Sequence, residues 1–306
     1  MQICLVFNPV ARGDKARHLR RHLDNLAARC VLKPTAKAGD ARLLAAQAAQ
    51  EGFSTIVAAG GDGTLNEVLN GIGDVPGAFN RVRLGVLPLG TVNVFAREMK
   101  IPFDVRRAWD IICRGHETAI DLPLAEFVSV PSLSSGSISD KKTERRYFIQ
   151  LAGAGLDSRA IELVNWELKK KIGPLAYVAA GFQAVRETHP LITAETEREF
   201  ASGELILLGN GRFYGGNFPL FPKANLQDGL LDTCIFPKAN FAQIIRAGFG
   251  LLTGRLHQFC QTQQLQSSDV TLRSSSRVIL QLDGDNVGEL PARISILPRA
   301  LRVITP

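Results

Sequence analysis

Glycines and acidic residues lie together in three short stretches of the sequence. Residues 60–71 read GGDGTLNEVLNG, residues 87–98 read LPLGTVNVFARE, and residues 282–285 read LDGD. The first stretch ends an apolar run and precedes an amphipathic helical pattern. Glycine lets backbone N–H groups approach an anion closely, and a helix that follows adds the positive end of its dipole. The pattern therefore predicts a phosphate-binding turn at residues 60–64.

Asp62 lies inside this predicted turn. A carboxylate beside a bare polyphosphate is repelled unless a divalent cation lies between them, so the acid indicates Mg²⁺. The commonest phosphate loops, G-x-x-x-x-G-K-[ST] and G-x-G-x-x-G, are absent from these stretches. A glycine turn in which Asp62 only caps the helix is the alternative that the residues leave open.

Strands and helices alternate over the first 120 residues. Strand-like apolar runs lie at residues 2–7, 54–60 and 83–90, and helical patterns lie at residues 14–30, 40–52 and 64–72. Such alternation implies right-handed crossovers and a mostly parallel sheet. We therefore predict an α/β domain over residues 1–122.

The pattern changes after Asp121 to short strand-like runs separated by turn residues. These runs include 146–152, 204–210, 230–236, 277–285 and 292–297, with one helical insert near 160–187 and an exposed Ser-rich excursion at 131–144. Regular short strands favour an antiparallel β domain, which we assign to residues 123–297. The last strand, residues 298–306, is free to return to the first domain.

Composition narrows the classes of protein and partner. The chain has 306 residues, 45% of them hydrophobic, which suffices for two cores. Its 36 basic and 29 acidic residues give a net charge of +7, which suits nucleotides and anionic membrane surfaces. The basic residues are dispersed rather than clustered with stacking aromatic residues, so we expect no nucleic acid partner.

Cysteines and apolar runs indicate the compartment. The five cysteines are scattered and form no C-x-x-C pair, which argues against a disulfide framework or a zinc site. No uninterrupted apolar run approaches the roughly 20 residues needed to span a bilayer. The N-terminus also lacks the pattern of a signal peptide. We expect a cytoplasmic protein that at most associates with a membrane peripherally.

Four stretches in family order resemble the diacylglycerol kinase catalytic superfamily, particularly its soluble bacterial lipid kinases. They are residues 60–71, 87–98, 221–232 (FPKANLQDGLLD) and 281–306, which together reach across nearly the whole chain. The resemblance implies ATP-dependent phosphorylation of a lipid hydroxyl with Mg²⁺. It also implies a doubly wound α/β domain, like those of NAD kinase and phosphofructokinase, and an antiparallel β-sandwich that receives the lipid, with the active site in the cleft between them.

The resemblance also assigns roles to individual residues. The nucleotide contacts that it implies are Asn8, Gly61, Asp62, Gly63, Thr64, Glu67, Gly90, Thr91 and Asn93. Many diacylglycerol kinases carry an acid directly after this asparagine, in a magnesium network, whereas this chain has Val94. The departure leaves Asp62 and Asp121 as the implied ligands of that network and makes diacylglycerol a less secure choice of acceptor.

A second magnesium site is implied near residue 228. There the resemblance pairs the carboxylate of Asp228 with loop carbonyl groups, and we include that of Leu230. A plain β-turn explains the same residues equally well.

Phosphoryl transfer to an alcohol needs a carboxylate that accepts the hydroxyl proton. The LDGD stretch matches the family's usual D-G-E, and we expect Asp283 to be the base and Asp285 to reach metal or nucleotide. An Asp-Gly hairpin turn between two strands fits the same residues, so we expect a tight turn that presents an acid.

Two other functions stay open. NAD kinase has a related fold and shares the G-G-D-G-T pattern, and a non-catalytic protein that binds nucleotide and lipid would also fit Val94 and Asp285. The expected partners are nucleotide and a lipid substrate at the membrane surface, with a homodimer left open. The identity of the lipid does not follow from the sequence.

Overall fold

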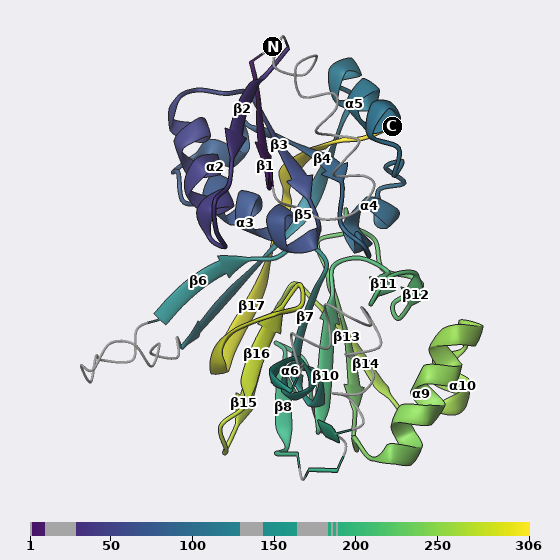
Figure 1. The fold of residues 1–306 in the computed structure, drawn as a ribbon. Helices are drawn as coiled ribbons and strands as arrows, with labels where there is room; N and C mark the ends of the chain where they lie inside the picture. The colour runs from purple at the N-terminus through teal and green to yellow at the C-terminus, as the bar shows by residue number, and fades with distance from the viewer. Residues whose placement is uncertain (1, 10–28, 129–142, 164–182, 185, 188) are drawn as a thin grey trace.

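The computed structural model describes residues 2–9, 29–128, 143–163, 183–184, 186–187 and 189–306. Figure 1 shows two parts, one above the other, with the N-terminal strands and most helices in the upper part. Long strands continue from the upper part into the lower one. The predicted fold class, α/β followed by antiparallel β, is confirmed.

The upper part is a parallel sheet with helices on its faces. Its strands lie in the order β2 (Val31–Pro34), β1 (Ile3–Phe7), β3 (Thr55–Gly60) and β4 (Arg83–Pro88), all parallel. The helices are α2 (Asp40–Gln50), α3 (Asp62–Gly73), the 3-10 turn η1 (Ala78–Asn80), α4 (Val94–Glu98) and α5 (Val105–Arg114). The central strands are buried along nearly their whole lengths, as expected of a parallel sheet covered on both faces.

Two long strands connect the upper and lower parts. β5 (Glu117–Val128) pairs antiparallel with β17 (Asp285–Ile304) from Glu117 opposite Ile304 to Val128 opposite Glu289. The register shifts between Leu297 and Leu301. Beyond this shift β17 also pairs parallel with β4, so its last residues lie in the sheet of the upper part. Residue 122, our sequence-based division, lies in the middle of β5.

The lower part is an antiparallel sandwich. Its other strands are β6 (Thr143–Tyr147), β7 (Leu151–Gly155), β8 (Ile192–Glu195), β9 (Phe200–Gly203), β10 (Leu205–Gly209), β13 (Leu231–Phe236), β14 (Gln263–Ser267), β15 (Asp269–Ser274) and β16 (Ile279–Leu282), with a small separate hairpin of β11 (Phe213–Tyr214) and β12 (Phe218–Pro219). Alternate residues such as Phe127, Ile206 and Leu280 point into one buried core. This alternation is the half-buried strand pattern that the sequence showed.

Among the described residues, short helices cover the outside of this sandwich. They are α6 (Leu156–Glu162), α9 (Phe241–Thr253) and α10 (Leu256–Phe259). Ala247 of α9 and Leu256 of α10 belong to the same core as Leu207 and Phe236 of the sheet. Figure 1 shows α9 and α10 at the outer edge of the lower part.

The structure differs from the sequence-based elements in several places. The run at residues 146–152, which we expected as one strand, is broken between β6 and β7 because the backbone N–H groups of Ile149, Gln150 and Leu151 bind a carboxylate instead of a neighbouring strand. Helices α5 and α9 and the short strand β2 were not predicted from the sequence.

Parts of three predictions lie outside the described residues. These are almost all of the helix at 14–30, nearly all of the excursion at 131–144, and the helical insert near 160–187 apart from its beginning in α6. Within the described ranges, no helix combines the length and apolar character needed to cross a bilayer.

Candidate functional site

The first glycine turn joins β3 to α3. A Cβ on Gly60 would collide with the side chain of Thr64, so the turn closes tightly over the first turn of the helix. Gly63 is different, because a Cβ there would meet none of the described residues within 4 Å and its φ is not in the left-handed region. The described part of the fold therefore gives no steric reason for glycine at position 63.

The second glycine turn, after β4, packs directly against the first. The backbone N–H groups of Leu89 and Gly90 donate to the carbonyl oxygen of Gly60 at 2.9 and 3.2 Å. A Cβ on Gly90 would lie 2.5 Å from the Cα of Gly61, which explains glycine at position 90. Asn93 is buried, and its backbone is in the left-handed region with φ 51°. Its Nδ2 donates to the Gly90 carbonyl at 2.7 Å. Thr91 is exposed between them.

Asp62 connects the two turns. Its carboxylate accepts the backbone N–H of Val94, at 3.2 Å, where α4 begins. Burial raises the pKa of the Asp62 carboxyl, and backbone N–H groups at the start of α4 oppose that rise. Asp62 thus caps a helix, as the alternative reading had it, but the helix is α4 and not its own α3. Val94, which replaces the acid of many relatives, contributes the N–H donor.

Asp283 connects the lower part to α3. Its carboxylate accepts the backbone N–H groups of Ile149, Gln150 and Leu151 at 2.9 to 3.0 Å, and Asn66 Nδ2 at 2.8 Å. Burial raises the pKa of the Asp283 carboxyl, and these four donors oppose the rise because they favour the ionised form. The break between β6 and β7 follows from these bonds.

Asp283 also begins the hairpin turn that the sequence predicted. Leu282 pairs with Asp285 across a two-residue loop in which Asp283 and Gly284 have φ of 49° and 92°. Positive φ at both central residues is the geometry that Asp-Gly favours in hairpins. Asp285 follows the turn and its side chain is exposed. The turn therefore holds one enclosed and one exposed carboxylate.

Two predicted nucleotide residues lie apart from the contacts between the turns. Glu67 uses both carboxylate oxygens for the backbone N–H groups of Gly39 and Ala41, at 3.0 and 3.1 Å, and so caps α2. Asn8 is exposed just beyond the carboxyl end of β1, which lies beside β3 in the sheet.

The predicted metal residues fall into two places. Asp121 is fully buried, and its two carboxylate oxygens accept the backbone N–H groups of Gly229 and Arg299, both at 2.7 Å. It therefore lies with the 225–230 loop and the β17 register shift. Asp228, in the same loop, is exposed and accepts the Leu230 N–H at 3.0 Å. The described residues contain no group of three or more His, Cys, Asp and Glu side chains that would hold a metal.

Two further polar pairs escaped the sequence analysis. Glu98 of α4, whose side chain is 5% exposed, binds Arg212 through Nε at 2.8 Å and also accepts Gln150 Nε2. Asp157 accepts the Tyr214 hydroxyl at 2.6 Å, and burial raises the pKa of the Asp157 carboxyl. The two residues of each pair are more than fifty positions apart in sequence, so neither pair could be predicted from local patterns. The one signal in the sequence was that Glu98 is the last residue of the 87–98 motif.

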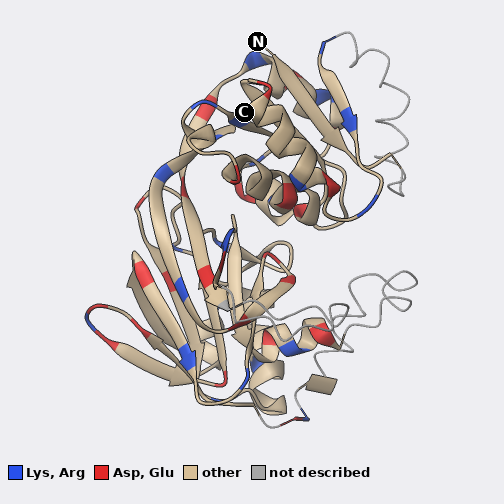
Figure 2. Cartoon of the chain, turned by 90° about the vertical axis from the view of Figure 1, so that its left-hand side faces the viewer, with Lys and Arg blue, Asp and Glu red and all other residues tan. Residues whose placement is uncertain are grey.

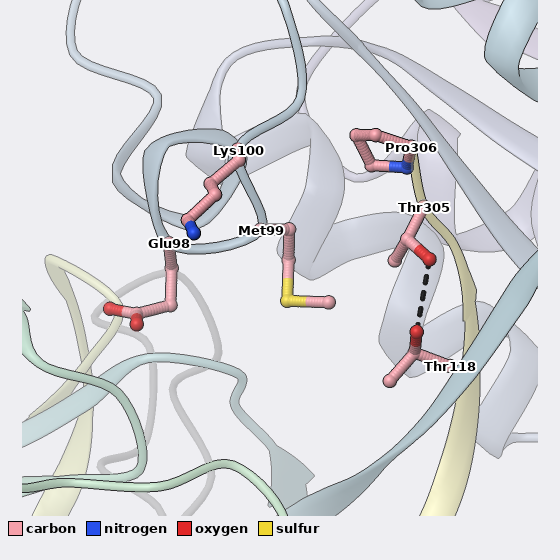
Figure 3. A pocket seen from close by; sticks show the side chains of 6 residues that line it. All are labelled: Glu98, Met99, Lys100, Thr118, Thr305 and Pro306. Atoms are coloured by element: carbon pink, nitrogen blue, oxygen red, sulfur yellow. Dashed lines mark hydrogen bonds between the residues drawn. The ribbon is translucent and has the colours of Figure 1, made fainter.

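A shallow hollow of about 260 Å³ lies where α4 ends (Figure 3). It is lined by Glu98, Met99, Lys100, Thr118, Thr305 and Pro306. The hydroxyls of Thr118 and Thr305 are hydrogen-bonded at 2.9 Å on one side of it. None of the predicted site residues lines this hollow, so we do not assign it to the candidate site.

Acidic and basic residues are mixed in both parts of the described chain. Figure 2 shows acidic and basic residues spread over both the upper and the lower part. The candidate site is therefore defined by its turns and carboxylates rather than by a basic surface.

Comparisons with known proteins bear on the family and the fold of this chain. Residues 2–125 match the family model of the diacylglycerol kinase catalytic domain, and residues 150–305 match that of the YegS C-terminal NAD kinase beta sandwich-like domain. A crystal structure of a diacylglycerol kinase from Bacillus anthracis strain Sterne covers all of this chain and 97% of its own, with a TM-score of 0.72 and 22% identity. At that identity the likeness concerns the fold.

Curated sequences give the closer similarity. A diacylglycerol kinase of Staphylococcus saprophyticus is 33% identical over 275 residues, which cover 89% of this chain and 83% of that protein. A diacylglycerol kinase of Staphylococcus aureus strain JH9 is 34% identical over 275 residues, covering 89% and 81%. With both domain matches in order and this identity over most of its length, the chain belongs to the diacylglycerol kinase family of lipid kinases.

Proposed function

We propose that this kinase transfers the γ-phosphate of ATP to the hydroxyl of a lipid alcohol of the diacylglycerol type. The names of the curated relatives support diacylglycerol as the first acceptor to test. ATP is the donor that membership of a kinase family implies. The triphosphate would lie against the two glycine turns, where Gly61 and Gly90 are in contact.

The open space beside Gly63 is the observation that carries the proposal. Glycine within a helix destabilises it relative to alanine, and among the described residues no atom beyond its chain neighbours and its own helix backbone lies within 4 Å of where a Cβ would be. A ligand that approaches the first backbone N–H groups of α3 accounts for this glycine, since such groups bind phosphate. Thr64, at the next position, supplies a hydroxyl donor on the same turn.

The proposed base is Asp285. Its side chain is exposed on the turn that Asp283 fixes through four N–H donors, so a lipid hydroxyl can reach it from the solvent side. In the proposed reaction the lipid oxygen forms a bond to the γ-phosphorus as the bond to the β-phosphate oxygen breaks. The hydroxyl proton passes to the Asp285 carboxylate, and ADP leaves. Asp283 then acts by fixing the turn that presents Asp285.

The residues fit a Mg²⁺ ion that arrives with the nucleotide rather than one held by the protein alone. Mg²⁺ commonly binds one or two carboxylates together with substrate phosphates and water. Asp62 is the acid that the glycine turns bring to this place, whereas the two oxygens of Asp121 accept the backbone N–H groups of Gly229 and Arg299. The cation would neutralise charge on the phosphate oxygens. We propose separately that a second ion binds Asp228 and the Leu230 carbonyl. These residues flank Gly229, whose N–H donates to Asp121.

A kinase assay with labelled ATP tests this function. The acceptors are dispersed short-chain diacylglycerol, sphingosine and NAD, each with Mg²⁺ and with EDTA. We expect labelled lipid, and we expect Asp285→Asn to lower kcat by about 10²–10⁴-fold, the usual contribution of a general base. The matched control is Asp110→Asn, an exposed acid on α5.

The outcomes separate the alternatives. Labelled NAD without labelled lipid would make the protein an NAD kinase, and binding of ATP and lipid without turnover by the wild type would make it a binding protein. A loss of kcat in Asp283→Asn with an unchanged free energy of unfolding, and no loss in Asp285→Asn, would return the base to Asp283.

A further inference from the structure

α9 has an exposed apolar face. Phe241, Ile245, Phe249 and Leu252 are 51–72% exposed. At 100° per residue these positions lie within about 80° of one another around the helix axis. Ala247 and Gly250, on the opposite side, are buried against the sheet and α10. Four large apolar side chains on the solvent side of one helix indicate that another surface covers them.

The chain segment that contains α9 is basic, although one carboxylate from between β9 and β10, that of Glu204, accepts the backbone N–H of Ala239 just before the helix. Residues 233–268 contain no Asp or Glu, but they contain Lys238, Arg246 and Arg255, all exposed. An apolar helix face flanked by basic residues is typical of helices that lie in the interface of an anionic bilayer. A second copy of this chain fits less well, because a symmetric contact would bring the basic residues of one copy toward those of the other.

The β11–β12 hairpin connects this face to the second glycine turn. β12 packs against α9, and its Phe218 is 39% exposed. At the tip of the hairpin, a Cβ on Gly216 would lie 3.6 Å from Val92, between Gly90 and Asn93. One short hairpin therefore spans the distance from α9 to the proposed phosphate site.

We propose that the exposed face of α9, with Phe218 beside it, docks on the surface of an anionic lipid bilayer. Phe241, Ile245, Phe249 and Leu252 enter the boundary between headgroups and acyl chains, and Lys238, Arg246 and Arg255 bind the anionic headgroups. The helix lies in the plane of the bilayer. Docking itself does not depend on the proposed function. The purpose of docking does rest on it, since the surface would deliver a membrane lipid to the kinase.

Vesicle sedimentation with the full chain tests docking. The vesicles are phosphatidylcholine alone or phosphatidylcholine mixed with phosphatidylglycerol. We expect the wild type to bind the mixed vesicles, and Leu252→Ser to weaken the partition coefficient about tenfold, as loss of one buried leucine would. Arg246→Gln with Arg255→Gln should weaken it roughly fivefold per arginine, with less effect at high salt. Leu43→Ser is the matched control, since Leu43 on α2 is 63% exposed, against 72% for Leu252.

Several results would overturn this inference. Equal binding of Leu252→Ser and wild type would do so, as would failure of the wild type to bind mixed vesicles. A change in mass by light scattering in Leu252→Ser, with vesicle binding unchanged, would assign the face to a second copy of the chain. Circular dichroism and a thermal melt check that each variant is folded.

A kinase arm distinguishes this inference from the proposed function. On monomeric short-chain diacylglycerol we expect Leu252→Ser to equal the wild type, and on diacylglycerol in mixed vesicles we expect it to lose about tenfold in kcat/KM, in line with its binding. Vesicle binding by α9 without any lipid phosphorylation would sink the proposed function and keep the docking surface. Equal phosphorylation of vesicle diacylglycerol by Leu252→Ser and wild type would keep the proposed function and exclude the docking surface.

Discussion

Asn66 Nδ2 donates to Asp283 Oδ2 at 2.8 Å, and this bond ties the helix after the first glycine turn to the hairpin that carries the exposed acid. We expect Asn66→Ala to lower the free energy of unfolding by about 1–3 kcal/mol, because a carboxylate loses one of its four donors. Asn66→Asp should lower it further, since two carboxylates would then face each other. Urea unfolding measures both.

The control for this prediction is Asn217→Ala, at an exposed asparagine between β11 and β12. Its effect should stay within about 0.5 kcal/mol. An Asn66→Ala midpoint and slope identical to those of the wild type would contradict the bond as a source of stability.

The glycines of the two turns should respond in opposite ways to substitution. Gly63→Ala should raise the free energy of unfolding by about 0.5–1 kcal/mol, because alanine favours the helix. It should also weaken ATP binding, because its Cβ would enter the proposed phosphate space. Gly90→Ala should instead destabilise by about 1–3 kcal/mol, because its Cβ would overlap Gly61. Unfolding curves and nucleotide titration calorimetry give the two readouts. Unchanged ATP affinity in Gly63→Ala would remove the phosphate from this place.

The ion pair of Glu98 and Arg212 holds α4 against the loop before β11. Arg212→Ala leaves the buried Glu98 carboxylate with fewer donors, and we expect the free energy of unfolding to fall by about 1–3 kcal/mol. The loss is smaller than for a fully buried pair because Arg212 is 38% exposed. Adding Glu98→Gln should recover part of the loss, because it removes the unpaired charge. A double-mutant cycle measures the coupling, and purely additive effects would show that the pair contributes nothing as a pair.

Asp157 should make the protein less stable as the pH rises. Since burial raises the pKa of its carboxyl in the native state, the folded protein binds this proton more tightly than the unfolded chain does. Its contribution is therefore fully present below the usual aspartate pKa of about 4 and is lost as the pH rises through the native pKa. Asp157→Asn keeps an acceptor for the Tyr214 hydroxyl and removes the titration.

Urea unfolding from acidic to neutral pH checks this sign. The stability of Asp157→Asn relative to wild type should increase over that interval, while Asp110→Asn should run parallel to wild type. A difference between Asp157→Asn and wild type that is constant with pH would show that the carboxyl does not titrate as stated.

Local patterns predicted the parts of the fold that local forces determine. The strand at 55–60, the helix after it and the Asp-Gly hairpin at 283–284 all follow from apolar runs and turn residues, and all are present. α9 was missed, although Asn240 caps its start and Gly254 ends it in the left-handed region, because its apolar residues lie on both faces and hide the helical period.

The partners of the acidic residues needed the tertiary structure. Glu67 meets the start of α2 and Asp62 meets the start of α4, in both cases across about 30 residues of chain. Asp283 meets backbone N–H groups more than 130 residues earlier. A motif indicates that an acid matters, but whether its oxygens face a ligand or a helix end depends on how the elements pack.

The paired strands β5 and β17 have a mechanical consequence. Two hydrogen-bonded strands cross from the upper part to the lower part without an intervening loop. Their regular pairing is interrupted between Glu289 and Ala292 and again between Leu297 and Leu301, where β17 enters the sheet of the upper part. Such a ribbon resists stretching and shear but flexes most readily where its ladder is broken. Movement of the lower part toward a nucleotide would therefore be a shallow bend at the second interruption, and Asp121, bound to the Arg299 N–H there, would be the residue that limits its amplitude.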